Sequence, residues 1–321
     1  MAIIEAHDIK KHFQLKKGLL GESSLLKAVD GVSFDVEKDS IFAIVGESGC
    51  GKSTLARILV RLLEPTEGTV TFQGKNIFQM DRPVLKDFRK SVQIIFQDPY
   101  ASLNPRMRVF STIAEPLKIH RIVPNSHIKE RVAELLESVG LTPDMMDKYP
   151  HEFSGGQRQR ICIARALSLA PQMIVADEPL SALDVSIQAQ ILNLLKDLKA
   201  KHGLSFIFIS HDLNVVHYFS DRVAVMYLGK IVECADTAKL FERPLHPYTE
   251  LLLKSAPKVE PKKESLHERP SDSSSDVPSP IDIPPGCPFH PRCIKRFEPC
   301  DKTVPGLTQK EGRMVRCLLY E

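Results

Sequence analysis

Gly46-Glu-Ser-Gly-Cys-Gly-Lys-Ser53 is the stretch that decides the fold of this 321-residue chain. It fits the phosphate-binding pattern G-x-x-x-x-G-K-[ST] at every fixed position. The apolar run Ile41–Val45 precedes it and indicates a buried strand, and Thr54–Leu63 follows with apolar residues at helical spacing. The sequence therefore predicts a strand, a phosphate-binding turn and a helix in direct succession.

Glycines let this turn adopt backbone angles that other residues avoid, so successive amide N–H groups point inward and surround an anion. The N-terminus of the helix adds partial positive charge at the same place. Lys52 is expected to reach the terminal phosphates, and the hydroxyl of Ser53 to bind Mg²⁺. The predicted contacts of a nucleoside triphosphate are Gly46, Glu47, Ser48, Gly49, Cys50, Gly51, Lys52, Ser53 and Thr54.

The composition is that of a globular protein, with 43% hydrophobic and 26% charged residues. The net charge of +3 is too small to indicate a nucleic-acid partner, which calls for a clustered basic stripe. No stretch approaches about 18 uncharged apolar residues, so no membrane-spanning helix is expected. The first residues, Met1–Glu5, lack the layout of a signal peptide. We expect a cytosolic chain that binds no nucleic acid.

The pattern along the chain predicts an α/β fold with a P-loop (RecA-like) core over residues 1–255. Further strands are expected at Ala28–Val36, Gly68–Phe72, Val92–Phe96, Met173–Ala176 and Leu204–Ile209. Residues from about 99 to 169 are expected to form a helical insertion, in which Ser126 caps a helix. Residues 256–286, rich in Pro and Ser, indicate a linker, and residues 287–321 a separate module with four cysteines.

Two carboxylates end the apolar strand that begins at Met173. In P-loop NTPases an Asp in this position helps to hold Mg²⁺, and this role fits Asp177. Glu178 follows it and could polarise the attacking water as a general base. The alternative is a solvated strand end without a catalytic role. The buried strand before this pair, and the phosphate loop upstream, favour the catalytic interpretation.

Two further polar residues follow predicted strands, His211 after Ser205–Ser210 and Gln97 after Val92–Phe96. Ligands gather at the carboxyl ends of strands in open α/β sheets. His211 could therefore contact the γ-phosphate and steady the general base, and the amide of Gln97 could bind Mg²⁺ or orient water. A lone histidine is more often structural, so the position of His211 is what favours a role in catalysis.

The stretch Phe153-Ser-Gly-Gly-Gln-Arg-Gln-Arg160 predicts a second anion site at a helix N-terminus. Ser154 is a good N-cap, and Gly155 and Gly156 leave backbone N–H groups accessible. Two phosphate-binding helix ends for one triphosphate suggest a nucleotide held between two subunits. Simple helix capping would account for Ser154 but not for the paired glycines together with Gln157.

Together these motifs resemble the ATP-binding-cassette (ABC) family, in both order and approximate spacing. The resemblance rests on the loop 46–53, Gln97, the signature Ser154-Gly-Gly-Gln157, Asp177, Glu178, the D-loop from Ser181 to Asp184, and His211. It implies an ATPase whose two nucleotide-binding domains pair head to tail, so that each signature closes over the ATP of the other. It also implies an aromatic residue near the N-terminus that stacks on adenine. Phe13 is the candidate, with His12 possible, although Phe13 could equally be a core residue.

Two stretches narrow the resemblance: Gln97-Asp-Pro-Tyr-Ala-Ser-Leu-Asn-Pro-Arg106 and Pro244-Leu-His-Pro-Tyr-Thr249. They are similar to the ATPase subunits of oligopeptide, dipeptide and nickel importers, and the first is most like the second ("F"-type) of two non-identical ATPases. This implies a paralogous ATPase, two transmembrane permease subunits and an extracytoplasmic substrate-binding protein as partners. The chain would lie peripherally at the cytoplasmic face of the membrane. Di- or oligopeptides are the expected cargo, with nickel or another small solute as the alternative. A soluble ABC ATPase without a transport role is less consistent with a single cassette.

The module at the end of the chain carries Cys287, Cys293, Cys300 and Cys317. Four thiolates could hold Zn²⁺ or a [4Fe–4S] cluster. The close C-x₂₋₄-C pairs typical of zinc sites are missing from this set. The stretch Cys287–Cys293 is similar to the C-terminal region of the importer subfamily, which implies an iron–sulfur cluster with a structural role. Zinc and unligated thiols remain open alternatives. The other cysteines, Cys50, Cys162 and Cys234, are interpreted as small buried side chains.

Overall fold

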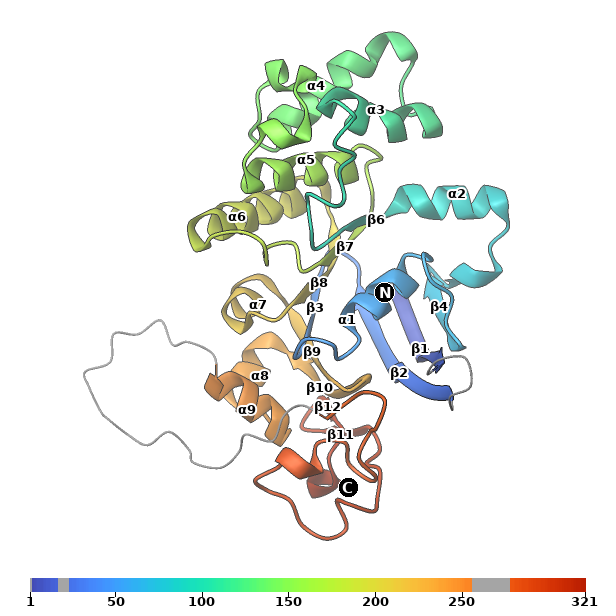
Figure 1. Ribbon diagram of the computed structural model, residues 1–321, viewed down its shortest axis with the longest axis vertical. Helices are drawn as coiled ribbons and strands as arrows, with labels where there is room; N and C mark the ends of the chain where they lie inside the picture. Colours follow the sequence, from blue (N-terminus) through green and yellow to red (C-terminus); the bar gives the residue numbers. More distant parts are fainter. Residues whose placement is uncertain (1, 17–22, 256–277) are drawn as a thin grey trace, which may run out of the picture.

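The computed structural model describes residues 2–16, 23–255 and 278–321. A mixed sheet of order β11-β12-β10-β9-β3-β8-β7-β6 crosses the described part of the molecule (Figure 1). Neighbouring strands from β9 to β6 are parallel, and those from β9 to β11 are antiparallel. The strands are β3 (Ile41–Val45), β6 (Val92–Ile95), β7 (Met173–Asp177), β8 (Ser205–Ser210), β9 (Arg222–Tyr227), β10 (Lys230–Asp236), β11 (Thr308–Lys310) and β12 (Arg313–Val315).

A second, antiparallel sheet of order β2-β1-β4-β5 lies beside the first (Figure 1). Its strands are β1 (Ala2–Lys16), β2 (Ser23–Glu37), β4 (Glu67–Phe72) and β5 (Lys75–Asn76). One hydrophobic cluster joins the two sheets and includes Ile4, Leu55 and Ile209. At their junction Phe34 of β2 stacks on Phe42 of β3 with ring centroids 4.9 Å apart. This packing fixes the N-terminal sheet against the strand that leads into the phosphate loop.

Helices cover the main sheet, and α3, α4 and α5 gather at one end of the molecule (Figure 1). These three lie inside the insertion predicted for residues 99–169. The α-helices are α1 (Lys52–Leu59), α2 (Arg82–Ser91), α3 (Val109–His120), α4 (Ile128–Ser138), α5 (Gly155–Leu167), α6 (Val185–His202), α7 (Leu213–Phe219), α8 (Thr237–Glu242) and α9 (Pro247–Ser255). Short 3₁₀ turns are η1 (Ile77–Gln79), η2 (Asn125–His127), η3 (Pro143–Asp147), η4 (Pro150–Glu152), η5 (His290–Arg292) and η6 (Leu318–Tyr320).

The parallel strands are nearly all apolar because they are buried on both faces. Every residue of β3, β7 and β8 is buried. The carboxyl ends of these strands meet at one edge of the sheet, where β3 leads into the phosphate loop. At the same edge β7 ends in Asp177, β8 is followed by His211, and β6 is followed after one residue by Gln97. The fold thus places Asp177, His211 and Gln97 beside the phosphate loop at one edge of the sheet.

Two local predictions were wrong. The helix after the phosphate loop ends at Leu59 rather than Leu63, because Arg61 adopts the left-handed conformation with φ 52°. Leu62 is consequently 57% exposed instead of packing in the core. Ser126 does not cap α4, because it lies inside the 3₁₀ turn η2 and His127 occupies the N-cap position.

The segment 278–321 is joined to the main sheet rather than standing apart from it. Strand β12 pairs with β10 through Glu233 opposite Val315 and Cys234 opposite Met314. Phe289 belongs to the largest hydrophobic cluster and is only 2% exposed. The division at 255 and 286 stays a prediction, and residues 256–277 of the predicted linker lie outside the described residues.

Candidate nucleotide-binding and catalytic site

A cavity of about 760 Å³ opens at the carboxyl edge of the sheet. This volume lies within the range typical of ligand pockets, about 300–1,000 Å³. The cavity is lined by Phe13, Leu26, Ala28, Ser48, Gly49, Gly51, Lys52, Ser53, Thr54, Gln97, Glu178, Ser181, His211 and Pro280. The structure therefore brings together most of the predicted nucleotide-binding and catalytic residues. Leu26, Ala28 and Pro280 were missed, since no sequence motif marks them.

Glycine is required at two points of the phosphate loop. Gly51 has φ +107°, and a Cβ there would lie 2.0 Å from the carbonyl oxygen of Ala28. Gly46 has φ +156°, and a Cβ there would lie 2.2 Å from the carbonyl oxygen of Met226. Because β2 and β9 approach the loop this closely, any side chain would force the loop out of place.

Lys52 is buried at the start of α1 and bonds to the loop itself. Its Nζ donates to the carbonyl oxygens of Gly46 at 2.8 Å and Glu47 at 3.0 Å. The same Nζ lies 3.8 Å from Oε1 of Glu178. The ammonium group therefore connects the loop with the carboxylate at the end of β7.

Ser53 at the start of α1 and Asp177 at the end of β7 are in direct contact. The Ser53 hydroxyl donates to Oδ1 of Asp177 at 3.0 Å. Burial raises the pKa of Asp177, and the hydrogen bond from Ser53 opposes that shift. Carboxylate and hydroxyl oxygens are ligands that Mg²⁺ accepts. This pair could hold the metal ion expected from the sequence.

Glu178 is held in position by two polar side chains. Nε2 of Gln97 donates to Oε2 of Glu178 at 3.1 Å, and Nδ1 of His211 lies 3.1 Å from the same oxygen. The backbone amide of Glu178 donates to the carbonyl of Ile209 at 3.0 Å. Contacts from the ends of the two strands that flank β7, β6 and β8, thus fix the orientation of this carboxylate inside the cavity.

The aromatic residue predicted to contact adenine lines the same cavity. Phe13 lies on β1 and is half-buried, with the ammonium group of Lys11 5.3 Å from its ring centroid. Phe13 is therefore accessible at the cavity wall instead of filling the core. The alternative residue, His12, pairs with Asp30 at 3.1 Å.

The signature residues do not line this cavity. Ser154 caps α5 by accepting the amide of Gln157 at 3.3 Å, and Oε1 of Gln157 accepts the amide of Ser154 at 3.0 Å. The expectation that capping explains only Ser154 is thus wrong, because this reciprocal capping box includes Gln157. Gly156 also has a packing reason, since a Cβ there would lie 2.5 Å from Cγ2 of Ile187.

The two D-loop residues have different surroundings. Ser181 lines the cavity, and its hydroxyl donates to the carbonyl of Glu178 at 3.1 Å. Asp184 lies at the start of α6, where it accepts the amide of Ile187 at 3.0 Å and the hydroxyl of Ser186 at 2.7 Å. The hydrogen bond from Ser186 is the main cause that lowers the pKa of Asp184.

Two predicted loop residues point away from the nucleotide cavity. Cys50 is 4% exposed, and burial raises its pKa, so its thiol is a packing group. Glu47 turns toward the C-terminal segment, where its carboxylate pairs with Arg292. Cys162 and Cys234 are buried as well, which confirms their interpretation as core side chains.

The four C-terminal cysteines lie close enough to influence one another. Burial, followed by the neighbouring thiols of Cys317, Cys300 and Cys293, raises the pKa of Cys287 to about 11. Burial also raises the pKa of Cys293 and of Cys317. Within the described ranges, no three His, Cys, Asp or Glu side chains are close enough to hold a single metal ion.

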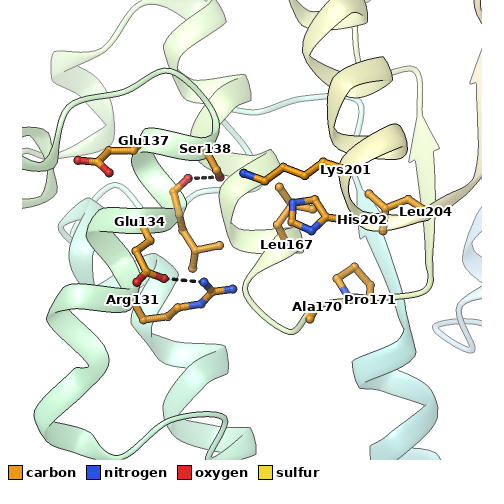
Figure 2. A pocket seen from close by; sticks show the side chains of 11 residues that line it. Arg131, Glu134, Glu137, Ser138, Leu167, Ala170, Pro171, Lys201, His202 and Leu204 are labelled. Atoms are coloured by element: carbon orange, nitrogen blue, oxygen red, sulfur yellow. Dashed lines mark hydrogen bonds and ion pairs between the residues drawn. The ribbon is translucent and has the colours of Figure 1, made fainter.

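A second cavity, of about 580 Å³, lies among α4, the end of α5 and the end of α6 (Figure 2). Among its lining residues, Arg131 bonds to Glu134 at 2.7 Å, and the hydroxyl of Ser138 donates to the carbonyl of Leu135 at 2.7 Å. No residue predicted for the nucleotide or the catalytic site lines it. This cavity is therefore separate from the chemistry at the phosphate loop.

Comparison with known proteins agrees with the geometry of the site. Residues 29–181 match the model of the ABC transporter family, and residues 232–300 match the family described as the C-terminal region of oligopeptide/dipeptide transporters. The chain is 51% identical to YkfD of Bacillus subtilis, covering 100% of this chain and 96% of that protein. It is 47% identical to the dipeptide transport ATP-binding protein DppF of Escherichia coli, covering 99% and 95%.

The fold is also similar to a solved ABC structure. A dimeric ATP-binding cassette in a post-hydrolysis state, bound to ADP and Pi, has a TM-score of 0.65 and 27% identity. The match covers 73% of this chain and 98% of that one.

The α/β fold, the phosphate loop and the carboxylates at the end of β7 define a P-loop NTPase. The family match shows that the chain belongs to the ABC transporter family. Within that family it belongs to the ATP-binding subunits of oligopeptide and dipeptide importers. Across the described residues, no helix has the length and apolar character needed to cross a bilayer.

Proposed function

We propose that this chain hydrolyses ATP at a site completed by a second ATPase subunit, and that hydrolysis drives the uptake of di- or oligopeptides across the cytoplasmic membrane. The observation that carries this proposal is the position of Glu178. Its carboxylate lies in the cavity of the phosphate loop, 3.8 Å from Lys52, and is held by Gln97 and His211. A carboxylate oriented in this way is suited to activate water beside a bound γ-phosphate.

In the proposed reaction, the loop amides and Lys52 bind the β- and γ-phosphates and stabilise the charge that develops there. Glu178 accepts a proton from water as the water oxygen bonds to the γ-phosphorus, and the bond to the ADP oxygen breaks. Gln97 and His211 keep the carboxylate of Glu178 directed at that water. The products are ADP and phosphate, and the remaining proton returns to solvent.

The residues around Ser53 fit Mg²⁺, because the hydroxyl of Ser53 and the carboxylate of Asp177 are adjacent oxygen donors. Gln97 is a further proposed ligand, through its amide oxygen. When bound, Mg²⁺ neutralises charge on the phosphates of ATP.

The signature residues are proposed to act on the ATP of the partner subunit. Ser154, Gly155, Gly156 and Gln157 begin α5 and are absent from the lining of this chain's own cavity. Ser154 and Gln157 are both solvent-accessible, so a second subunit could approach them. The dimeric cassette with ADP and Pi supports a two-subunit arrangement. We propose a non-identical paralogue as the partner.

The proposed assembly also contains two transmembrane permeases and an extracytoplasmic substrate-binding protein, with this chain peripheral at the cytoplasmic face. The stretch after Gln97 is the proposed permease contact. Tyr100 in this stretch is 55% exposed, with the guanidinium of Arg158 5.2 Å from its ring centroid. A large exposed aromatic side chain is a common anchor in protein interfaces.

The four cysteines of the C-terminal segment are proposed to hold a [4Fe–4S] cluster, with zinc as the alternative. The gathered thiols are favourable ligands for such a cluster. The close C-x₂₋₄-C pairs typical of zinc sites are missing from this set, which favours the cluster over zinc. Cys287 and Cys293 pack against the main core cluster, so the proposed role is structural.

Transport in a reconstituted system tests the proposed function. The tagged chain would be purified with its membrane partners from its own host and placed in proteoliposomes. ATP-dependent uptake of a labelled dipeptide, lost in Lys52→Ala, is the expected result. Uptake of ⁶³Ni²⁺ without peptide uptake would point to the alternative cargo. Recovery of ribosomes or DNA in place of permeases would contradict the proposal.

The proposed cluster has a separate test. Protein purified without oxygen should show broad visible absorption that disappears when Cys287, Cys293, Cys300 and Cys317 are all replaced by Ser. Stoichiometric zinc in a colourless protein would contradict the cluster.

A further inference from the structure

Glu47, the second residue of the phosphate loop, is held by Lys52 of the same loop and by two residues from distant parts of the chain. Its backbone amide donates to the hydroxyl of Tyr248 at 3.0 Å. Its carbonyl accepts from Nζ of Lys52 at 3.0 Å. Both of its carboxylate oxygens accept from Arg292, each at 2.8 Å. The contacts of Tyr248 and Arg292 span 201 and 245 residues of sequence, so distant parts of the chain meet at this position.

Hydrogen bonds within and around the stretch 244–249 hold Tyr248 in place. No residue of this stretch lines the nucleotide cavity. The buried carboxylate of Glu233 accepts the backbone amides of Leu245 and His246, each at 2.9 Å. Nδ1 of His246 accepts the amide of Tyr248 at 3.0 Å. Tyr248 itself is 0% exposed. Its hydroxyl is therefore a fixed acceptor for Glu47, with little freedom to move away.

Packing contacts of the C-terminal segment hold Arg292 in place. Phe289, three residues earlier, packs against Tyr227 and Tyr248 with ring centroids 5.4 and 5.3 Å away. The guanidinium of Arg292 lies 5.9 Å from the ring centroids of Tyr227 and Phe289. Its side chain is only 10% exposed, so solvent screens the pair with Glu47 weakly. A bidentate pair of this kind fixes geometry as well as charge.

We propose that Tyr248 and Arg292 are positioning residues that clamp Glu47 and thereby set the phosphate loop for nucleotide. Because Arg292 is next to Cys293 in the sequence, the affinity of the site for nucleotide would depend on whether the C-terminal segment is correctly folded. This inference rests on the proposed ATP site. It gives the stretch 244–249 and the ion pair a common role, because both act on the same residue of the loop.

A double-mutant cycle tests the clamp. The full chain and the variants Glu47→Gln, Arg292→Gln and the double variant would be titrated with a fluorescent ATP analogue and Mg²⁺. We expect each single variant to bind roughly tenfold more weakly, and the double variant to bind no more weakly than either single variant. With the partner ATPase present, KM for ATP should rise while kcat at saturating ATP changes less than about twofold.

Conservative and control variants separate positioning from simple loss of structure. Arg292→Lys keeps the charge without the bidentate geometry and should restore part of the affinity. Tyr248→Phe should weaken binding without touching any charge. Lys295→Gln is the matched control, because Lys295 lies in the same segment but pairs with Glu250 of α9. It should leave nucleotide affinity unchanged even where it lowers the melting temperature.

Each result decides the matter. Additive losses in the cycle, or normal affinity in Arg292→Gln, would overturn the clamp. If Arg292→Gln does not fold, Glu47→Gln carries the test alone, because it leaves the C-terminal segment intact, and normal affinity in that variant overturns the clamp. If the unmodified chain binds no ATP analogue, the proposed ATP site fails, which is a different result from a failed cycle.

Discussion

Glu178 adopts a backbone conformation that a glutamate rarely occupies, with φ 45°. A residue other than glycine in this region costs on the order of 1–3 kcal/mol and persists only where its surroundings fix it. Here the amide bond to Ile209 and the side-chain contacts with Gln97 and His211 supply that constraint. The strained residue is also the proposed general base, so the strain serves to place its carboxylate in the cavity.

Replacing this carboxylate by an amide separates binding from chemistry. Glu178→Gln keeps the size and most hydrogen bonds of the side chain but removes the proton acceptor. We expect ATP binding to be kept and ATPase turnover to fall about 10²- to 10⁴-fold. Phosphate release by the chain with its partner ATPase measures the effect. Glu134→Gln, the same change on the exposed face of α4, is the control, and normal turnover in Glu178→Gln would remove Glu178 from its role.

His246 gives the fold a dependence on pH. Burial lowers the pKa of His246 to about 3 from its ordinary value of 6.5. Between these two pH values the unfolded chain binds a proton that the folded protein does not, so stability falls as the pH drops below 6.5. This residue should contribute a loss of about 2 kcal/mol between pH 7 and pH 5.

Urea unfolding at the two pH values measures this contribution. In His246→Asn the side-chain oxygen can still accept the amide of Tyr248, but the residue does not titrate. The unmodified chain should lose more stability than this variant when the pH is lowered from 7 to 5. An equal loss in both proteins would show that His246 does not remain neutral in the folded state.

At the scale of the elements, the contact between α5 and α6 depends on a glycine. A Cβ at Gly156 would lie 2.5 Å from Cγ2 of Ile187, whereas a Cβ at Gly155 would make an ordinary contact at 3.4 Å with Leu183. Gly156→Ala should therefore cost about 1–3 kcal/mol of stability as the helices separate. Thermal unfolding of both alanine variants checks this, with Gly155→Ala as the control. Equal melting temperatures would contradict the packing argument.

Elements with a strong pattern could be predicted from the sequence, whereas several helix ends could not. The strands before Gly46, Asp177 and His211 are buried on both faces, and continuous apolar runs reveal them. The end of α1 at Leu59 depends on the left-handed Arg61, and no residue type at that position signals it. The N-cap of α4 moved from Ser126 to His127 because a 3₁₀ turn precedes the helix.

In the candidate site, too, some features could be predicted from the sequence and others could not. Residues in fixed motifs, such as Lys52, Asp177 and Glu178, could be placed because loop and strand ends determine their neighbours. The contacts of Glu47 could not be predicted, because the packing of β9, α9 and the C-terminal segment creates them. The capping role of Gln157, by contrast, follows from the sequence alone, because Ser154 and Gln157 have the S-x-x-Q spacing of a capping box.

For the whole molecule, the last two strands complete the main sheet. β12 covers the edge of β10, which is buried along most of its length. A chain truncated after Ser255 would expose this edge, and unpaired strand edges favour association between molecules. We expect the truncated chain to form oligomers and to melt at a lower temperature, as measured by light scattering and calorimetry.

Full-length Arg292→Gln is the control for this truncation, since it loses the pair with Glu47 but keeps β11 and β12. It should stay in the same oligomeric state as the unmodified chain. A truncated chain that matches the unmodified one in both measurements would show that the edge of β10 needs no cover.

The long sequence separation within the clamp has a consequence during synthesis. The loop emerges early from the ribosome, but its partners Tyr248 and Arg292 follow 201 and 245 residues after Glu47. At translation rates of about 5–20 residues per second, Arg292 is synthesised roughly 10–50 s after Glu47. A nascent chain would thus gain full nucleotide affinity only near the end of translation, so incomplete products would compete poorly for ATP.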